Sequence, residues 1–308
     1  MIVASHRLNL RLTRPGVLLP WLGPALRGLV ARQFKEQVCL HPPTERQAWK
    51  YCRGCPHLAN CPYGQTYEPD PPHGVQVLPH DEEAARPLVL APYFPVPAAA
   101  QPGLEVPLRV VIVGAAARHS GPLLSALVEA GRDGLGVDRI GFELVETAAQ
   151  PEIWQLRAED LPASPDVVAG TLPRLGLGLT APLFLYTREE RGGRRRPVER
   201  PEFIDLFRAA LRSVGRLFAC CDQPLEADWN ALKEAALQVR LIEHCYEPFR
   251  QPRSSSRSGS RYELQGVVGG GVYADVPMAL VPWLVWAGRL HVGTYRVHGA
   301  GGWRLVLD

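Results

Sequence analysis

The chain has 308 residues, 46% of them hydrophobic, which suits two domains of ordinary size with ample core. Its net charge of +3 is modest for a nucleic-acid-binding protein. Of the 34 basic residues, however, 31 are arginine, which favours RNA as a partner. The alternative explanation of this arginine content is a GC-rich genome. The longest apolar run is too short to span a bilayer, which excludes a membrane span. Arginines interrupt the apolar N-terminus, which excludes a signal peptide. Together these features predict a soluble, cytoplasmic protein.

The first half of the chain alternates predicted strands and helices. Leucines alternate with polar residues near its start, which predicts a half-buried strand over residues 2–12. Apolar residues at helical spacing predict a helix over 24–37, in which Gly28 indicates a close-packed neighbour. The later predicted elements are an edge strand over 87–91, a strand over 106–113, a helix over 122–130 that Ser120 caps and Gly131 ends, and a strand over 140–145.

Four of the seven cysteines gather between the first predicted helix and the next strand. Cys52 and Cys55 form a C-x2-C pair, whose thiolates can share a tetrahedral ion on one tight turn, and Cys39 and Cys61 complete four ligands. In an intracellular chain such a cluster indicates a metal before a disulfide, and a closed site of this kind is structural. Zinc, an iron–sulfur cluster and free thiols all stay open as interpretations, and a nearby histidine could replace one thiolate.

The second half repeats the outline of the first after an irregular join at 149–176. Its predicted elements are a strand over 179–186, helices over 202–218 and 229–239, an extended stretch over 241–249, a strand over 262–273, a buried helix over 276–286 and a strand over 303–307. Two halves with one outline predict an α+β fold of two tandem ferredoxin-like domains, residues 1–150 and 170–308.

The stretch 288–302 interleaves glycines with basic residues and histidines. Glycine lets backbone N–H groups approach a ligand closely, and cationic or imidazole side chains at this spacing favour a phosphate contact. The stretch runs into a strand, unlike a P-loop, so a glycine-rich hairpin that only closes a domain stays open as an interpretation. A dinucleotide site around Gly114 is a weaker alternative, because only one of the three expected glycines is clearly in place.

Several segments, taken in their order and spacing, carry a family resemblance. They are the first helix at 25–29, the cysteine series ending in Cys61-Pro-Tyr, Val113-Gly-Ala-Ala with the glycines at 131–136, Arg253-Ser with Arg257-Ser258, Leu264-x-Gly-x-x-Gly269, and the glycine-rich tail at 290–301. In these segments the chain resembles the CRISPR-associated RAMP-superfamily endoribonucleases that process precursor CRISPR RNA. The resemblance implies two RRM-like domains, with the cysteine segment 39–63 inserted in the first.

The resemblance also implies a chemistry, namely metal-independent cleavage in which the RNA's own 2′-hydroxyl attacks the adjacent phosphate. The cut leaves a 2′,3′-cyclic phosphate and needs a base, an acid and positive charge. Family members often carry a catalytic histidine near the first helix, but residues 13–38 contain none. The candidates are therefore His41 and His298, with Arg27 as the neutralising cation. Members that manage without histidine would instead give Arg27, Arg32 and Lys35 the electrostatic role.

The expected partner is CRISPR repeat RNA, and other CRISPR effector subunits are further candidates. The expected RNA contacts are Arg253, Arg257, Ser258, Arg289, His291, Gly299 and Gly301. Zinc is the expected structural cofactor, and no cofactor is expected in catalysis. The alternative function is a non-catalytic RAMP subunit that binds a crRNA end inside an effector complex.

Overall fold

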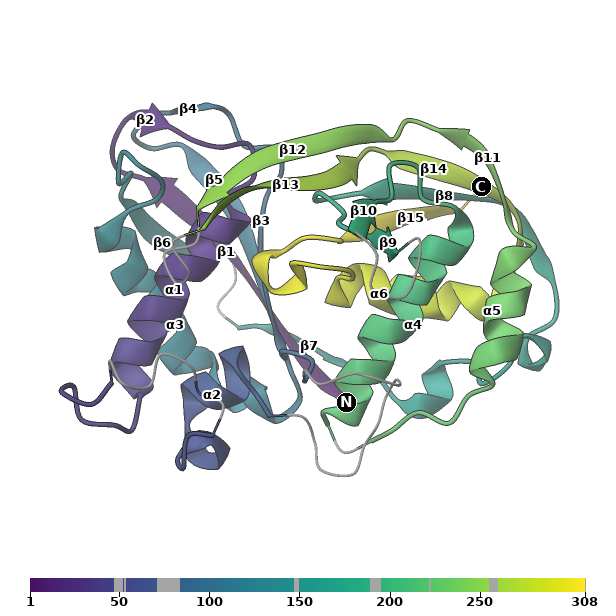
Figure 1. The fold of residues 1–308 in the computed structure, drawn as a ribbon, viewed down its shortest axis with the longest axis horizontal. Coiled ribbons are helices and arrows are strands. Elements are labelled where there is room, and N and C mark those ends of the chain that lie inside the picture. The colour runs from purple at the N-terminus through teal and green to yellow at the C-terminus, as the bar shows by residue number, and fades with distance from the viewer. Residues whose placement is uncertain are drawn as a thin grey trace. The chain divides into compact units, whose positions relative to one another are not determined.

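The computed structural model describes residues 1–46, 52, 54–70, 84–146, 150–188, 195–221, 223–254 and 260–307. The chain forms two compact units, the first comprising Met1–Leu156 with Gly215–Pro224 and the second comprising Arg157–Val214 with Leu225–Asp308. Each unit is mixed α/β and contains an antiparallel main sheet (Figure 1). Within the described ranges, no helix is long and apolar enough to cross a membrane.

The first unit runs strand, helix, strand, strand, helix, strand along the chain. These elements are β1 (Ile2–Leu12), α1 (Gly23–Val38), β3 (Leu88–Pro92), β5 (Glu105–Val113), α3 (Ser120–Asp133) and β6 (Phe142–Glu146). The strands pair antiparallel in the order β3-β5-β1-β6, and β7 (Glu152–Gln155) pairs with the start of β1. Shorter elements are β2 (Gly16–Val17), α2 (Pro62–Tyr67) and β4 (Ala99–Ala100). The strands and helices predicted for this half are confirmed, with small shifts in their ends.

The alternation along β1 determines which face of the first sheet is buried. Leu8, Leu10 and Leu12 are at most 3% exposed, whereas Arg7 and Arg11 are exposed. Successive side chains of a strand point to opposite faces, so the leucines share the core face and the arginines lie on the other. α1 and α3 pack against each other in the same unit and bury their own apolar residues (Figure 1).

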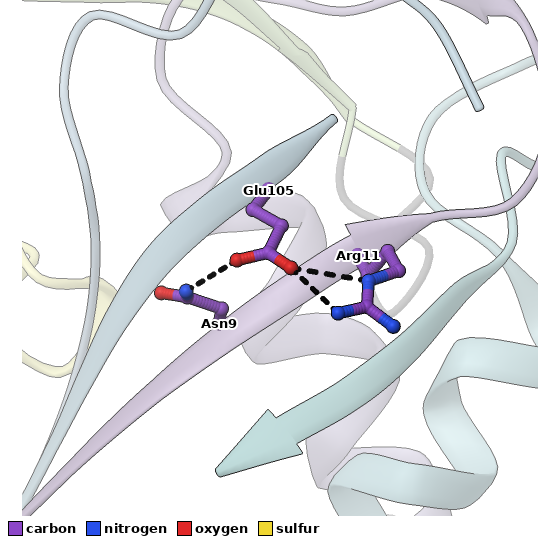
Figure 2. A network of polar contacts seen from close by, with 3 residues as sticks. All are labelled: Asn9, Arg11 and Glu105. Atoms are coloured by element: carbon purple, nitrogen blue, oxygen red, sulfur yellow. Dashed lines mark hydrogen bonds and ion pairs between the residues drawn. The ribbon is translucent and has the colours of Figure 1, made fainter. Parts of the chain in front are cut away.

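A polar network covers part of the exposed sheet face (Figure 2). Glu105 of β5 accepts hydrogen bonds from Arg11 Nη2 at 2.8 Å and from Asn9 Nδ2 at 2.7 Å, both on β1. These two bonds, that of Arg11 first, hold the pKa of the Glu105 carboxyl below its usual range. Because Glu105 already pairs with Arg11, this arginine is committed to a contact within the sheet.

Gly28 of α1 and Gly131 of α3 have opposite surroundings. α3 continues past Gly131 and ends before Gly134, which has a φ of +78°, so the predicted stop at Gly131 is wrong. A Cβ atom at Gly131 would collide with the carbonyl oxygen of Phe142. At Gly28 of α1 an added Cβ would meet no atom within 4 Å, so the close neighbour predicted there is also wrong. The predicted cap is wrong as well, because the Ser120 hydroxyl donates backwards to the Ala117 carbonyl.

These surroundings predict opposite effects for one chemical change. Gly28→Ala is expected to raise the free energy of unfolding by about 0.5–1 kcal/mol, because alanine loses less backbone entropy on folding. Gly131→Ala is expected to lower it by about 1–3 kcal/mol, because the helix must shift away from β6. Urea unfolding of both variants measures the difference, and equal effects of the two changes would contradict the packing described here.

The second unit repeats the order of the first with one additional helix and two inserted hairpins. Its main elements are β8 (Thr171–Leu179), α4 (Phe203–Ala219, of which 203–214 belong to this unit), α5 (Trp229–Leu237), β11 (Arg240–His244), β14 (Gly270–Pro277), α6 (Val281–Leu290) and β15 (Trp303–Leu307). The sheet order is β11-β14-β8-β15. One hairpin pairs β9 (Tyr186–Arg188) with β10 (Arg195–Pro197), and the other pairs β12 (Glu247–Ser254) with β13 (Arg261–Val268), the long two-stranded ribbon of Figure 1.

Two strand predictions for this half are wrong. The strand predicted over 179–186 lies earlier, as β8, and residues 180–185 are irregular apart from a single bridge at Leu183. Glycines at 176 and 178 and a proline at 173 give β8 a low strand propensity, although its leucines alternate. The single strand predicted over 262–273 is two strands, because Gly269, with a φ of +97°, turns the chain where a side chain would collide with the Cys245 carbonyl.

Candidate functional site

The four cysteines predicted to bind metal line one small cavity in the first unit. Cys39 directly follows α1 and Cys61 directly precedes α2, so the two helices position these thiols. The N–H of Cys55 donates to the carbonyl of Cys52 at 2.9 Å and closes a tight turn. Gly54 within this turn has a φ of +78°, a conformation that favours glycine. The sequence spacing therefore corresponds to thiols that face one space.

His41 lies in the same cavity and is 7% exposed. Its Nε2 is 3.2 Å from Cys55 Sγ, and its Nδ1 is 3.7 Å from a carboxylate oxygen of Glu45. Its ring meets His57 edge-on, with 4.9 Å between the ring centroids. One of the two predicted catalytic histidines thus stands among the predicted metal ligands.

The donor set of this cavity suits zinc in its chemistry. Thiolate and imidazole are the ligands that structural zinc sites use, and the cysteines are free of disulfides. Burial, followed by the nearby Glu68 carboxylate, raises the pKa of the Cys52 thiol to about 12, so a bound cation would have to displace its proton. As the side chains stand, no group of three or more His, Cys, Asp or Glu within the described ranges is placed to hold a metal ion. The metal knuckle therefore stays a prediction.

The cations of α1 rest on aromatic rings or pair with carboxylates. The guanidinium carbon of Arg27 lies 5.4 Å from the centroid of the Tyr67 ring, and Lys35 Nζ lies 5.4 Å from that of Tyr63. The two tyrosine rings stack with 5.2 Å between centroids and 6° between planes. Arg32 pairs with Asp133 of α3 at 2.6 Å. Arg27, the predicted neutralising cation, is therefore held on a ring of α2.

Tyr67 carries a buried hydroxyl that has no hydrogen-bond partner among the described residues. An unpaired buried hydroxyl costs about 1–3 kcal/mol, so Tyr67→Phe is expected to leave the free energy of unfolding unchanged or raise it by about 1 kcal/mol. Tyr273 is the matched control, because its buried hydroxyl donates to the Pro201 carbonyl at 3.1 Å and accepts from the Tyr246 hydroxyl at 2.7 Å. Tyr273→Phe should cost about 1–2 kcal/mol in urea unfolding. If Tyr67→Phe lowered the free energy of unfolding more than Tyr273→Phe does, the Tyr67 hydroxyl could not be the unpaired one.

Arg253 is the centre of a second cluster, in the second unit. It lies on β12 directly opposite Tyr262 of β13, and its guanidinium carbon is 5.6 Å from that ring centroid and 5.1 Å from that of Tyr295. Its Nη2 is 3.2 Å from His298 Nε2. A guanidinium only donates, so Nε2 accepts this bond and the proton of the neutral imidazole is assigned to Nδ1. The structure thus brings together two predicted site residues that lie 45 positions apart.

Tyr295 and His298 come from the glycine-rich stretch, which folds into a loop braced from within. η6 (Arg296–His298) lies between Tyr295 and Gly299, both in the left-handed region with φ of +65° and +83°. The Arg296 side chain, 9% exposed, donates through Nη1 to the Leu290 carbonyl at 3.0 Å. His291, 2% exposed, bonds through Nδ1 to the Ala300 carbonyl at 3.0 Å. The loop therefore turns two of its basic or imidazole side chains inward.

Of the remaining predicted RNA contacts, the structure describes Arg289 but not Arg257 or Ser258. Arg289 lies on α6 with its guanidinium carbon 5.1 Å from the ring centroid of Trp286. Arg257 and Ser258 lie outside the described residues. Sequence reasoning missed Tyr262 and Tyr295, because a lone tyrosine in a strand or loop does not indicate which cation it will contact. One signal was available in the sequence. Tyr262 follows the segment of Arg253 and Arg257, and Tyr295 lies within the stretch 288–302, and both segments were predicted to contact RNA.

Comparison with known proteins places the chain in a family. The AF_1859_N family model, described as an N-terminal domain, matches residues 1–165, which is more than half of the chain. The chain belongs to this family. No curated protein matches it.

Solved structures share the fold of this family member over its whole length. A Cas6 product complex has a TM-score of 0.57 at 16% identity and covers 99% of this chain and 100% of its own. Thermus thermophilus Cas6 has a TM-score of 0.52 at 14% identity, with 99% of both chains covered. A partial Cas6-RT-Cas1–Cas2 complex has a TM-score of 0.58 at 12% identity and covers 100% of this chain and 46% of its own. The resemblance predicted from the sequence is thereby confirmed at the level of the fold.

Proposed function

We propose that this chain is an endoribonuclease that processes CRISPR precursor RNA and that both of its units are ferredoxin-like RAMP domains. The observation that carries the proposal is the end-to-end fold match to a Cas6 product complex, which leaves almost no part of either chain without a counterpart. The strand order of the two sheets supports the domain assignment, because each unit has its first and third strands in the middle of the sheet. CRISPR repeat RNA is the proposed substrate and partner.

The proposed reaction uses a nucleophile that belongs to the RNA. The 2′-oxygen attacks the adjacent phosphorus and the bond to the 5′-oxygen breaks, which yields a 2′,3′-cyclic phosphate and a 5′-hydroxyl. A base must take the 2′-hydroxyl proton, an acid must protonate the leaving 5′-oxygen, and a cation must offset the charge of the phosphorane. No resident metal is needed for any of these three tasks, so the proposed enzyme is metal-independent.

We assign both proton transfers to His298, which takes the 2′-hydroxyl proton as base and gives it to the leaving 5′-oxygen as acid, and we assign the nearby positive charge to Arg253. These two side chains meet at 3.2 Å, so a phosphate that engages the guanidinium is brought beside an imidazole. A phosphate oxygen that accepts from Arg253 would also release the Nε2 lone pair to accept the 2′-hydroxyl proton. His41 is the less favoured candidate, because its Nε2 contacts the Cys55 thiol. Arg27 stays a candidate for a second neutralising cation.

We also propose that Cys39, Cys52, Cys55 and Cys61 hold a structural zinc ion. The support is the shared cavity that these thiols line and their reduced state. When bound, zinc would tie the end of α1 to the start of α2 and so stabilise this part of the first unit. It would take no part in the RNA chemistry.

The alternative function is a non-catalytic RAMP subunit that binds a crRNA end within an effector complex. Such a subunit would have the same fold and the same cluster around Arg253, so only activity separates the two functions. The test is incubation of the purified protein with RNA of its host's CRISPR repeat in the presence of EDTA. A single cut supports the endoribonuclease, whereas tight binding without a cut favours the alternative. No binding to repeat RNA would contradict both.

A further inference from the structure

Several backbone amides of the glycine-rich loop already have partners inside the protein. The N–H of Gly299 donates to the Arg296 carbonyl at 2.9 Å, and the N–H of Gly301 donates to the Pro182 carbonyl at 3.0 Å. These are two of the amides that the sequence predicted as phosphate ligands. A phosphate cradle needs several convergent N–H groups that have no partner inside the protein. These amides instead hold the loop in shape.

The glycines of the loop are explained by this bracing. Gly301 has a φ of +71°, and a side chain there would collide with the carbonyl of Val292. Gly293 has a φ of +75°, and a Cβ atom added there would lie only 2.8 Å from the carbonyl oxygen of Phe184. Both positions require glycine so that the chain can turn tightly against its neighbours. The loop needs its glycines for internal packing.

The braced loop delivers two side chains to one guanidinium. Tyr295 offers its ring and His298 its Nε2 to Arg253, while Tyr262 offers a second ring from the facing strand. A free arginine samples many rotamers, so holding it on two rings reduces the entropy lost when its N–H groups bind an anion. The planar guanidinium is suited to two oxygens of one phosphate.

We infer that Tyr262 and Tyr295 are positioning residues that hold the Arg253 guanidinium for one phosphodiester group of the RNA, and that the glycine-rich loop acts by placing Tyr295 and His298. The inference rests on the proposed function, because it takes RNA as the ligand. It assigns the phosphate contact at this place to a side chain instead of a backbone cradle.

The test is the affinity for the host's CRISPR repeat RNA, measured by filter binding on ice over a series of salt concentrations. Arg253→Ala is expected to weaken binding and to reduce the slope of log affinity against log salt by about 0.7–0.9, the contribution of one phosphate contact. Tyr295→Leu is expected to weaken binding by about 2- to 5-fold without changing the slope, because the charge stays and the ring is lost. Tyr295→Phe keeps the ring and should bind like the unmodified protein.

Controls separate a positioning role from a folding defect. Tyr262→Leu, at a side chain that is 39% exposed, tests the second ring if Tyr295→Leu does not fold. Tyr93→Leu and Arg212→Ala change an exposed tyrosine and an exposed arginine outside the cluster and should leave the affinity unchanged. Unchanged affinity in Tyr295→Leu and Tyr262→Leu, an equal loss in Tyr295→Phe, or an unchanged slope in Arg253→Ala would each overturn the inference. If the unmodified protein does not bind the RNA, the proposed function itself fails.

Discussion

Replacement of His298 by alanine is expected to slow the cleavage of CRISPR repeat RNA by about 10²- to 10⁴-fold, the usual contribution of a general acid–base. The imidazole accepts from Arg253 and is neutral in this geometry, so its loss should change RNA affinity far less than the rate. Single-turnover cleavage with excess protein, together with filter binding, measures the two effects separately. A parallel loss of rate and affinity would instead indicate that His298 acts only by placing Arg253.

His41→Ala is the matched comparison, because both histidines are under 10% exposed and both were predicted as catalytic. We expect this variant to cleave at nearly the original rate when its folded fraction is taken into account. Loss of cleavage in His41→Ala with normal cleavage in His298→Ala would reverse the assignment. Normal cleavage by the double variant would exclude both histidines and transfer the chemistry to arginine and lysine.

Removal of the proposed zinc ion is expected to produce the largest change in stability. Structural zinc sites contribute about 10–16 kcal/mol of apparent binding free energy in zinc-finger peptides, so even a fraction of this value would dominate the stability of the first unit. We expect the purified protein to contain one zinc ion per chain by elemental analysis. A strong chelator should lower the unfolding midpoint, and readdition of zinc should restore it.

Cysteine variants locate the proposed ion. Cys55→Ser is expected to lose the zinc and to lower the unfolding midpoint as the chelator does. Cys245→Ser is the matched control, because Cys245 is an exposed free thiol of the second unit. Protein without metal after purification in zinc-containing medium, or equal effects of the two substitutions, would contradict the proposed site.

Much of the fold could be predicted because its elements carry regular apolar patterns. The second half of β1 alternates and α1 carries a helical stripe, and both elements were found with nearly correct ends. β8 was missed because glycines and Pro173 have low strand propensity, although its leucines alternate, and pairing with β14 and β15 holds the strand in place. That pairing joins segments far apart in the chain, which a local pattern does not report.

The candidate site could be predicted only in part, because its members meet through the fold. The cysteine spacing correctly indicated thiols around one space, since Cys52 and Cys55 lie on one turn. The glycine spacing suggested a phosphate cradle, but the carbonyl of Pro182 uses one of the expected amides. The partnership of Arg253 with Tyr295 and His298 depends on how the loop folds back on the hairpin, which no local spacing encodes.

The proposed function is tested most directly with repeat RNA that carries a single 2′-deoxynucleotide on the 5′ side of the cut. In EDTA we predict that the protein binds this RNA as tightly as the unmodified repeat but leaves it intact, because the nucleophile is missing. The unmodified repeat should give a product that ends in a 2′,3′-cyclic phosphate by mass spectrometry. Cleavage of the deoxy-substituted RNA at the same position would contradict attack by the RNA's own 2′-hydroxyl.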